Sequence, residues 1–215
     1  MTTQHIDFLI QFILFLPILT LHETAHAWVA LKCGDDTAKH MGRISLNPLV
    51  HIDLIGTVVL PLLALFTGGG LIGWGKPVPI DPVNFRRYRF DDNLVAMAGP
   101  AANVLLAAVA LAGMRLAQWF GSDTTASIFL QLAFLSVYLA FFNLIPIPPL
   151  DGSHLLKNAI HLDEASYARF TTFGFIVLIL LIQLPVVGRT LEVLTLNTVN
   201  ALFWLVHFIP AGAAG

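Results

Sequence analysis

Long apolar stretches separated by short polar segments dominate the pattern along the chain. Five stretches approach the length of about 20 residues that a helix needs to cross a hydrocarbon core roughly 30 Å thick. They are residues 8–32, 94–119, 126–147, 171–187 and 191–209. A sixth apolar stretch, 52–67, is shorter and runs directly into three glycines. The pattern predicts an all-α polytopic membrane protein with about five to six transmembrane helices.

The composition agrees with a membrane protein and excludes most soluble classes. Of the 215 residues, 57% are hydrophobic and only 11% are charged, and the mean hydropathy is +0.80. That charged fraction is less than half of the roughly 25% in an ordinary soluble domain. The formal net charge of −2 argues against a nucleic acid as partner. The single cysteine, Cys33, excludes an internal disulfide and a cysteine metal cluster.

The positions of the cations predict how the chain lies in the membrane. If 52–67 crossed fully, the Lys and Arg residues would show no strong bias to one side. If 52–80 instead enters the membrane and returns, three loops share one face: 33–51, 73–93 and 148–170. That face then holds nine of the eleven cations, counting Lys32 at its edge, as expected of a cytoplasmic face. Because non-helical backbone at membrane depth must be covered by protein or line a wet cavity, we expect a re-entrant or β-hairpin-like segment near 52–80 beside a cavity.

The first apolar stretch contains the sequence Leu21-His22-Glu23-Thr24-Ala25-His26. Histidines at positions i and i+4 share one face of a helix, so both rings can bind one zinc ion. Glu23 lies beside them and can take a proton from a water molecule at the metal. The alternative is a pair of polar residues that pack helices together. Ionisable groups inside a span are costly and usually functional, which favours the metal.

Catalytic zinc needs a third protein ligand and a fourth position for water. Asp151 is the candidate, at the end of the run Asn143-Leu-Ile-Pro-Ile-Pro-Pro-Leu-Asp151-Gly152. The same run is also ordinary turn chemistry where a helix leaves the bilayer. The re-entrant topology places Asp151 on the same side of the membrane as His26, whereas full crossing at 52–67 places it on the opposite side. The cation distribution and the metal hypothesis therefore favour the same topology.

Three motifs, in this order along the chain, resemble those of the site-2 proteases, zinc enzymes that cut other proteins within the membrane. They are His22-Glu23-x-x-His26, Gly99-Pro100-Ala-Ala-Asn103 and Asn143-x-x-Pro146-x-x-x-Leu150-Asp151-Gly152. The resemblance covers roughly residues 10–160. It implies one zinc per chain with water in the fourth position, three metal ligands, a catalytic base and two substrate-binding asparagines. By this resemblance His22, His26 and Asp151 are the metal ligands, Glu23 is the catalytic base, and Asn103 and Asn143 bind the substrate.

The chain also departs from the family pattern. Many relatives have Gly-Arg after the Leu-Asp-Gly motif, whereas Ser153 and His154 follow here. His154 is near enough to Asp151 to support the metal or to bind it, or it is a histidine at a membrane interface. No segment is long enough for a PDZ domain or a pair of CBS domains. We expect one membrane-embedded domain over residues 1–215, with a catalytic core at about 8–160 and additional C-terminal helices at about 170–210.

Several residues outside the motif histidines have two interpretations. Asn103 and Asn143 either bind the substrate or hold helices together. His51 and Asp53 flank the re-entrant segment and are candidates for metal contact. The segment 73–80 alternates prolines with residues that favour strands, so it either pairs with an unwound substrate as an added strand or is a kinked connector.

The expected activity is hydrolysis of peptide bonds in or next to transmembrane segments of other membrane proteins. The composition and the cation distribution predict a multi-pass protein of the cell membrane with its active site toward the cytoplasmic side. Its partners are then a transmembrane protein substrate and the lipid bilayer, and a regulatory membrane partner or a homo-oligomer is left open. The alternatives are a catalytically silent membrane chaperone, a metal-transport protein, and a prenyl-protein endopeptidase. The last would need a glutamate ligand, for which the chain offers only Glu164 and Glu192.

Overall fold

The structure is a computed structural model, which describes residues 3–67 and 73–207. Within these ranges every regular element is a helix and no strand occurs, which confirms the predicted all-α class. The α-helices are α1 (Thr3–Cys33), α2 (Thr37–His40), α3 (Leu60–Thr67), α4 (Tyr88–Trp119), α5 (Asp123–Asn143), α6 (Gly152–Ala159), α7 (Glu164–Ile182) and α8 (Pro185–Val206). Two short 3-10 helices, η1 (Pro48–His51) and η3 (Pro82–Asn84), and one π-helix, η2 (Leu54–Val59), lie between α2 and α4.

Four helical segments are long and apolar enough to cross a membrane. They are His5–Cys33, Tyr88–Trp119, Asp123–Asn143 and Glu164–Ile182. Helix α8 is also 22 residues long but is not among the four; it carries Arg189 and Glu192 among several polar side chains. The predicted span 191–209 overlaps α8 and ends outside the described residues. The count of five to six spans therefore stays a prediction.

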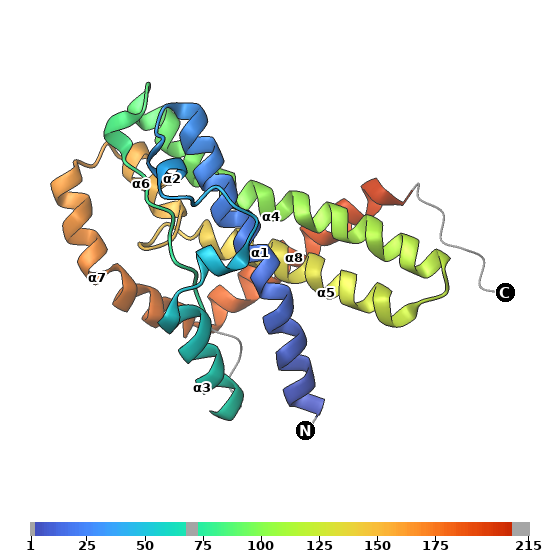
Figure 1. The fold of residues 1–215 in the computed structure, drawn as a ribbon. Helices are drawn as coiled ribbons and strands as arrows, with labels where there is room; N and C mark the ends of the chain where they lie inside the picture. Colours follow the sequence, from blue (N-terminus) through green and yellow to red (C-terminus); the bar gives the residue numbers. More distant parts are fainter. Residues whose placement is uncertain (1–2, 68–72, 208–215) are drawn as a thin grey trace. The chain divides into compact units, whose positions relative to one another are not determined.

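Residues 1–91 form one compact unit around α1. Helices α2 and α3 lie beside opposite ends of α1 in Figure 1. The π-helix η2 runs into α3, and Asp53 begins it by accepting hydrogen bonds from the N–H groups of Ile55 and Gly56, as an N-cap does. The apolar helix 54–66 is too short to cross a bilayer. It lies where a re-entrant segment is expected, but 68–72 lie outside the described residues, so that topology stays a prediction.

Residues 92–215 form the second compact unit. Its core joins α4, α5 and α8, and small side chains let these helices approach closely. The buried members of this core are Ala107, Ala110, Leu111, Met114, Ala117, Ala126, Ala133, Val137 and Val199. Figure 1 shows α4 and α5 side by side, connected by a short turn. The unit begins inside α4 and includes the Pro-rich run that leads into α6.

Candidate metal centre

Helix α1 holds His22 and His26 one turn apart on one face. Their Nε2 atoms are 3.0 Å apart, and the ring planes are inclined by 80° with centroids 4.6 Å apart. Both side chains are buried, each with 6% of its surface exposed. The spacing of four residues therefore brings the two rings together on one face of α1, as predicted from the sequence.

The histidine pair suits one zinc ion. Zn–N bonds of about 2.0–2.1 Å in a tetrahedral site place two ligand nitrogens roughly 3.3 Å apart. The observed separation of 3.0 Å is close to that value without any movement of the helix. Neutral imidazole is a preferred zinc ligand, and a buried pair of rings is shielded from water. The residues present on α1 therefore fit a zinc ion.

Glu23 is held by a backbone group from a distant part of the same unit. The Val78 N–H donates to Glu23 Oε2 at 3.0 Å. Val78 is buried with Ala27 and Ala38, so its N–H is fixed in place. Sequence reasoning missed this contact. The signal that could have pointed to it is the pair Pro77 and Pro79, since neither proline has an N–H and Val78 is the single donor of the three.

The segment Gly73–Ile80 is bonded to the rest of its unit along one edge. The N–H groups of Trp74 and Lys76 donate to the carbonyls of Gly56 (3.2 Å) and His51 (2.9 Å). The carbonyls of the same two residues accept from Thr57 Oγ1 (2.7 Å) and Arg43 Nη2 (2.6 Å). The Val78 N–H makes the bond to Glu23 described above. Within the segment, all of these bonds are therefore made by even-numbered residues. The segment is not assigned as a strand, but it has this strand-like alternation.

The odd-numbered residues of the segment form its other edge. Gly73, Gly75, Pro77 and Pro79 make none of these bonds, and together they carry four carbonyl groups but only two N–H groups, those of the two glycines. This edge is therefore rich in acceptors and poor in donors. Gly75 also lies against α1, because a Cβ there would be 2.6 Å from a methyl carbon of Leu19.

Asp151 occupies the position just before the first residue of α6, in the second unit. Its backbone is helical, with φ −57° and ψ −36°, and its carboxylate makes no capping hydrogen bond, so it is not engaged as an N-cap side chain. The next residue must be glycine, since a Cβ on Gly152 would lie 2.2 Å from the carbonyl oxygen of Leu144. The Leu-Asp-Gly motif thus forms a tight turn into a helix. Asp151 and the two histidines belong to different units, so its part as third ligand stays a prediction.

The two candidate asparagines differ in how their amides are engaged. Asn103 is 1% exposed, and its side-chain Oδ1 has no hydrogen-bond partner among the described residues. Its backbone carbonyl accepts from Ser136 Oγ at 2.8 Å, which ties α4 to α5. Asn143 Nδ2 donates to the Leu139 carbonyl of its own helix at 2.9 Å. Substrate binding by either residue stays a prediction, with Asn103 the better placed because its Oδ1 is not engaged.

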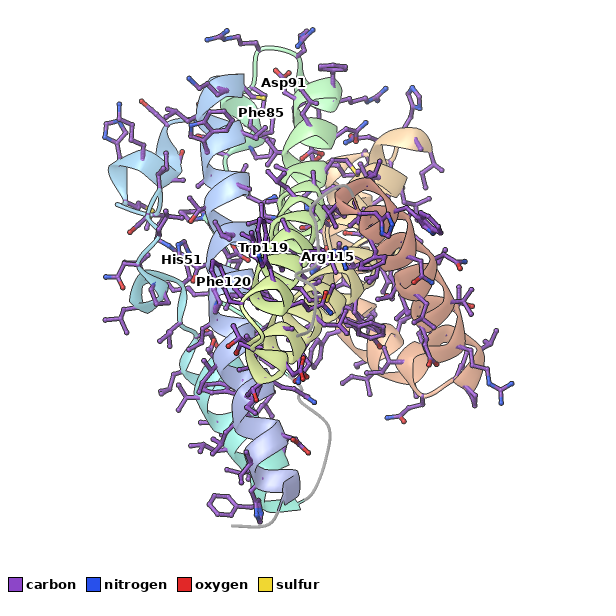
Figure 2. The ribbon with its side chains drawn as sticks, turned by 90° about the vertical axis from the view of Figure 1, so that its right-hand side faces the viewer. His51, Phe85, Asp91, Arg115, Trp119 and Phe120 are labelled. Atoms are coloured by element: carbon purple, nitrogen blue, oxygen red, sulfur yellow. The ribbon has the colours of Figure 1, made fainter. Side chains whose placement is uncertain are left out.

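His51 and Asp53 make hydrogen bonds within the loop that lies beside α1 in Figure 2. His51 is fully buried, and its Nε2 lies 2.9 Å from the Ser45 carbonyl. Asp53 caps η2 as described above. Both residues therefore make structural hydrogen bonds, and a metal contact by either stays a prediction.

A buried polar network surrounds Asp92 in the second unit. The Asp92 carboxylate accepts from His154 Nδ1 (3.1 Å), Lys157 Nζ (3.0 Å) and Asn158 Nδ2 (2.7 Å). Lys157 also pairs with Glu164 at 3.1 Å. Burial by itself lowers the pKa of Lys157, but the bonds to the two carboxylates outweigh it and raise that pKa above its usual value. His154 thus bonds to Asp92, a partner that its place in the sequence did not indicate.

The helices and the site define a multi-pass membrane protein with a His-Glu-x-x-His centre inside a candidate span. Comparison with known proteins agrees. The model of peptidase family M50 matches residues 120–184. The chain is 38% identical over 177 residues to "Putative zinc metalloprotease YwhC" of Bacillus subtilis, covering 77% of this chain and 76% of the relative.

A second relative, Rip2 of Mycolicibacterium smegmatis, carries the same zinc metalloprotease description. It is 32% identical over 176 residues, which cover 80% of this chain and 65% of the relative. No solved structure matches the chain significantly. The chain belongs to peptidase family M50, the site-2 protease family. The family and the names of its relatives support a peptidase with zinc as its metal.

Proposed function

We propose that the chain is an intramembrane protease, which hydrolyses peptide bonds in or next to transmembrane segments of other membrane proteins. The observation that carries this proposal is the depth of the histidine pair. His22 and His26 lie well inside the candidate span His5–Cys33, both are buried, and their Nε2 atoms are 3.0 Å apart. A substrate must therefore reach the site at membrane depth.

The metal site of the proposed enzyme consists of His22, His26 and Asp151, with one zinc per chain and water in the fourth position. When bound, zinc supplies Lewis-acid chemistry: it makes a water molecule acidic enough to ionise near neutral pH and polarises the scissile carbonyl. Glu23 accepts the proton of that water at its carboxylate and returns a proton to the leaving amine. The Val78 N–H supports this role because it fixes one carboxylate oxygen at 3.0 Å.

The substrate backbone has to be unwound before it can react, because the carbonyls and N–H groups of a helix bond to one another. The odd-numbered edge of Gly73–Ile80 suits an unwound strand. Its carbonyls at Gly75, Pro77 and Pro79 accept hydrogen bonds from substrate N–H groups, as in strand addition. In this proposal Asn103 and Asn143 hold the substrate backbone through their amides.

The proposed enzyme lies in the cell membrane with its active site toward the cytoplasmic side. This orientation follows from the nine cations on the face that holds Arg86, Arg87 and Arg89. These three arginines are exposed: Arg86 and Arg87 just before α4, and Arg89 in its first turn. In this proposal the enzyme has two partners. They are the lipid bilayer that surrounds it and a transmembrane protein that is its substrate.

The first test measures zinc per chain in protein purified in mild detergent, for wild type and Asp151→Ala. We expect about one zinc per chain in the wild type and a sharp loss in the variant. Glu164→Gln is the control, because it keeps the hydrogen bond to Lys157 but removes the ligand that a prenyl-protein endopeptidase would need. Equal zinc in wild type and Asp151→Ala would exclude Asp151 as third ligand.

The second test asks for proteolysis itself. Membranes that contain Glu23→Ala are compared with wild type for membrane proteins that are cut only by the wild type, and trapped substrates are recovered with the variant. Cleavage that depends on Glu23 separates a protease from a silent chaperone or a metal transporter. If zinc-loaded wild type and Glu23→Ala produce the same fragments, the proposal is wrong.

A further inference from the structure

We propose that His51 is a positioning residue for Glu23, and that it acts through the backbone of Lys76–Val78. The inference rests on the proposed function, in which Glu23 is the base. It is carried by a closed path of contacts within the first unit. The path leaves α1 at Thr24, passes through Ser45, His51, Lys76 and Val78, and returns to α1 at Glu23, the neighbour of Thr24.

The first part of the path attaches His51 to α1. The Ser45 carbonyl accepts two hydrogen bonds, from Thr24 Oγ1 at 2.7 Å and from His51 Nε2 at 2.9 Å. Since a carbonyl can only accept, His51 carries its proton on Nε2. The same Nε2 lies 3.4 Å from Thr24 Oγ1. The imidazole is thus fixed directly against the turn of α1 that bears Glu23.

The second part of the path leads from His51 to the base. The His51 carbonyl accepts from the Lys76 N–H at 2.9 Å. Two residues later the Val78 N–H donates to Glu23 Oε2 at 3.0 Å. Pro77 between them has a fixed φ, which removes one of the few torsions that separate the two N–H groups and so limits their independent movement. A shift of His51 therefore moves the donor that orients the Glu23 carboxylate.

The burial of His51 shows what its ring must supply. The side chain is 0% exposed, and its Nδ1 has no hydrogen-bond partner among the described residues. The ring is therefore held through one donor at Nε2. Glutamine can place an amide N–H near the Nε2 position, whereas the shorter asparagine amide reaches only the region of Nδ1. The pair His51→Gln and His51→Asn thus separates the donor from the volume of the side chain.

Amide hydrogen exchange of Gly73–Ile80, read by mass spectrometry on detergent-solubilised protein, tests the path without substrate. Glu23→Ala removes the acceptor of Val78, so we expect exchange in this peptide to rise by about ten-fold or more, the effect of losing one buried hydrogen bond. We expect a similar rise in His51→Asn. In His51→Gln we expect exchange within about two-fold of wild type, because the Nε2-like donor is restored.

Thr24→Val provides a second route to the same link. It removes the other hydrogen bond to the Ser45 carbonyl and keeps the side-chain shape. We expect a smaller rise in exchange at Gly73–Ile80 than in His51→Asn, and this measurement decides the matter if His51→Asn does not fold. Equal exchange in wild type, Thr24→Val and every folded His51 variant would overturn the inference.

Cleavage kinetics then separate positioning from general stability. With zinc content unchanged, we expect His51→Asn to lower kcat by about ten-fold or more at similar KM, and His51→Gln to restore most of it, because only base alignment is altered. Equal kcat values in His51→Gln and His51→Asn would overturn the inference. A chain that shows the exchange pattern but never cuts a substrate would contradict the proposed function, while the path to Glu23 would stand.

Discussion

Lys157 and Asp92 form an ion pair of 3.0 Å in which the two side chains are only 2% and 4% exposed. Asp92 lies in the N-terminal part of α4 and Lys157 in α6. A buried charge is tolerated only when it is paired and hydrogen-bonded. The pair therefore fixes α6, whose N-cap is Asp151, against the start of α4.

Removal of the cation alone should be strongly destabilising. Lys157→Met leaves the Asp92 carboxylate buried without its cation, so we expect a loss of roughly 3–5 kcal/mol of unfolding free energy. The double variant Lys157→Met/Asp92→Asn removes both charges and should recover part of that loss. Thermal unfolding of the four species in one detergent measures the coupling. Additive effects of the two substitutions would contradict the pairing.

Asp35 predicts an acid-dependent loss of stability. The carboxylate is fully buried and accepts hydrogen bonds from the Thr37 hydroxyl, from Asn84 Nδ2 and from the N–H groups of Asp81 and Thr37. Burial by itself raises its pKa, but these bonds outweigh burial and hold the pKa below the ordinary value of 3.8. The stabilisation is therefore complete above the unfolded pKa and is lost as the pH falls through the folded one.

Asp35→Asn tests this directly. The amide must place an N–H against at least one existing donor, so we expect about 1–3 kcal/mol lower stability at neutral pH. The variant should also lose part of the decline in melting temperature below pH 3.8, the ordinary pKa of the carboxyl group. If wild type and variant melt in parallel across that acid range, Asp35 is not a source of the pH dependence.

Two glycines should respond to alanine in opposite ways. In Gly152→Ala the new Cβ would lie 2.2 Å from the Leu144 carbonyl oxygen, and no atom lies within 4 Å of the corresponding Cβ at Gly188. We expect Gly152→Ala to cost about 1–3 kcal/mol through overpacking. Gly188→Ala, in a helix, should stabilise by roughly 0.5–1 kcal/mol. Melting temperatures measured side by side check both, and a tolerated Gly152→Ala would contradict the tight turn before α6.

Metal removal should lower the stability of the wild type because a ligand that binds only the folded state stabilises it by mass action. We expect chelation to lower the melting temperature and added zinc to restore it. Glu23→Gln should keep this response, since Glu23 is proposed as the base and not as a ligand, and His22→Ala should lose it. A chelator effect of equal size in His22→Ala would mean that the metal binds elsewhere.

The helical class and the histidine pair could be predicted from the sequence because both depend on local spacing. Apolar runs that are long enough to cross a membrane predict helices. Two residues at positions i and i+4 of a helix always lie on the same face, one turn apart. His22 and His26 lie together for that reason. The last helix is less clearly marked in the sequence, because polar residues such as Arg189 weaken the apolar signal of α8.

The contacts that hold the site could not be predicted in the same way. Val78 and Glu23 are 55 residues apart, and Lys157 and Asp92 are 65 apart by their numbers. Such contacts depend on how segments fold back on one another, which periodicity does not report. His51 is the clearest example: its place in the sequence made it one candidate for metal contact, and nothing in the sequence pointed to the hydrogen bond between its ring and the Ser45 carbonyl.

The two prolines of Gly73–Ile80 have a consequence for the behaviour of the protein at high density in a membrane. An exposed backbone edge with alternating donors and acceptors can pair with an identical edge on another molecule and begin aggregation. Along this edge Pro77 and Pro79 have no donor, and Gly75 is buried against α1. Two copies brought face to face would oppose carbonyl to carbonyl. In the proposed function this edge receives a substrate strand that brings its own donors, and the missing donors at Pro77 and Pro79 disfavour pairing between two copies of the segment.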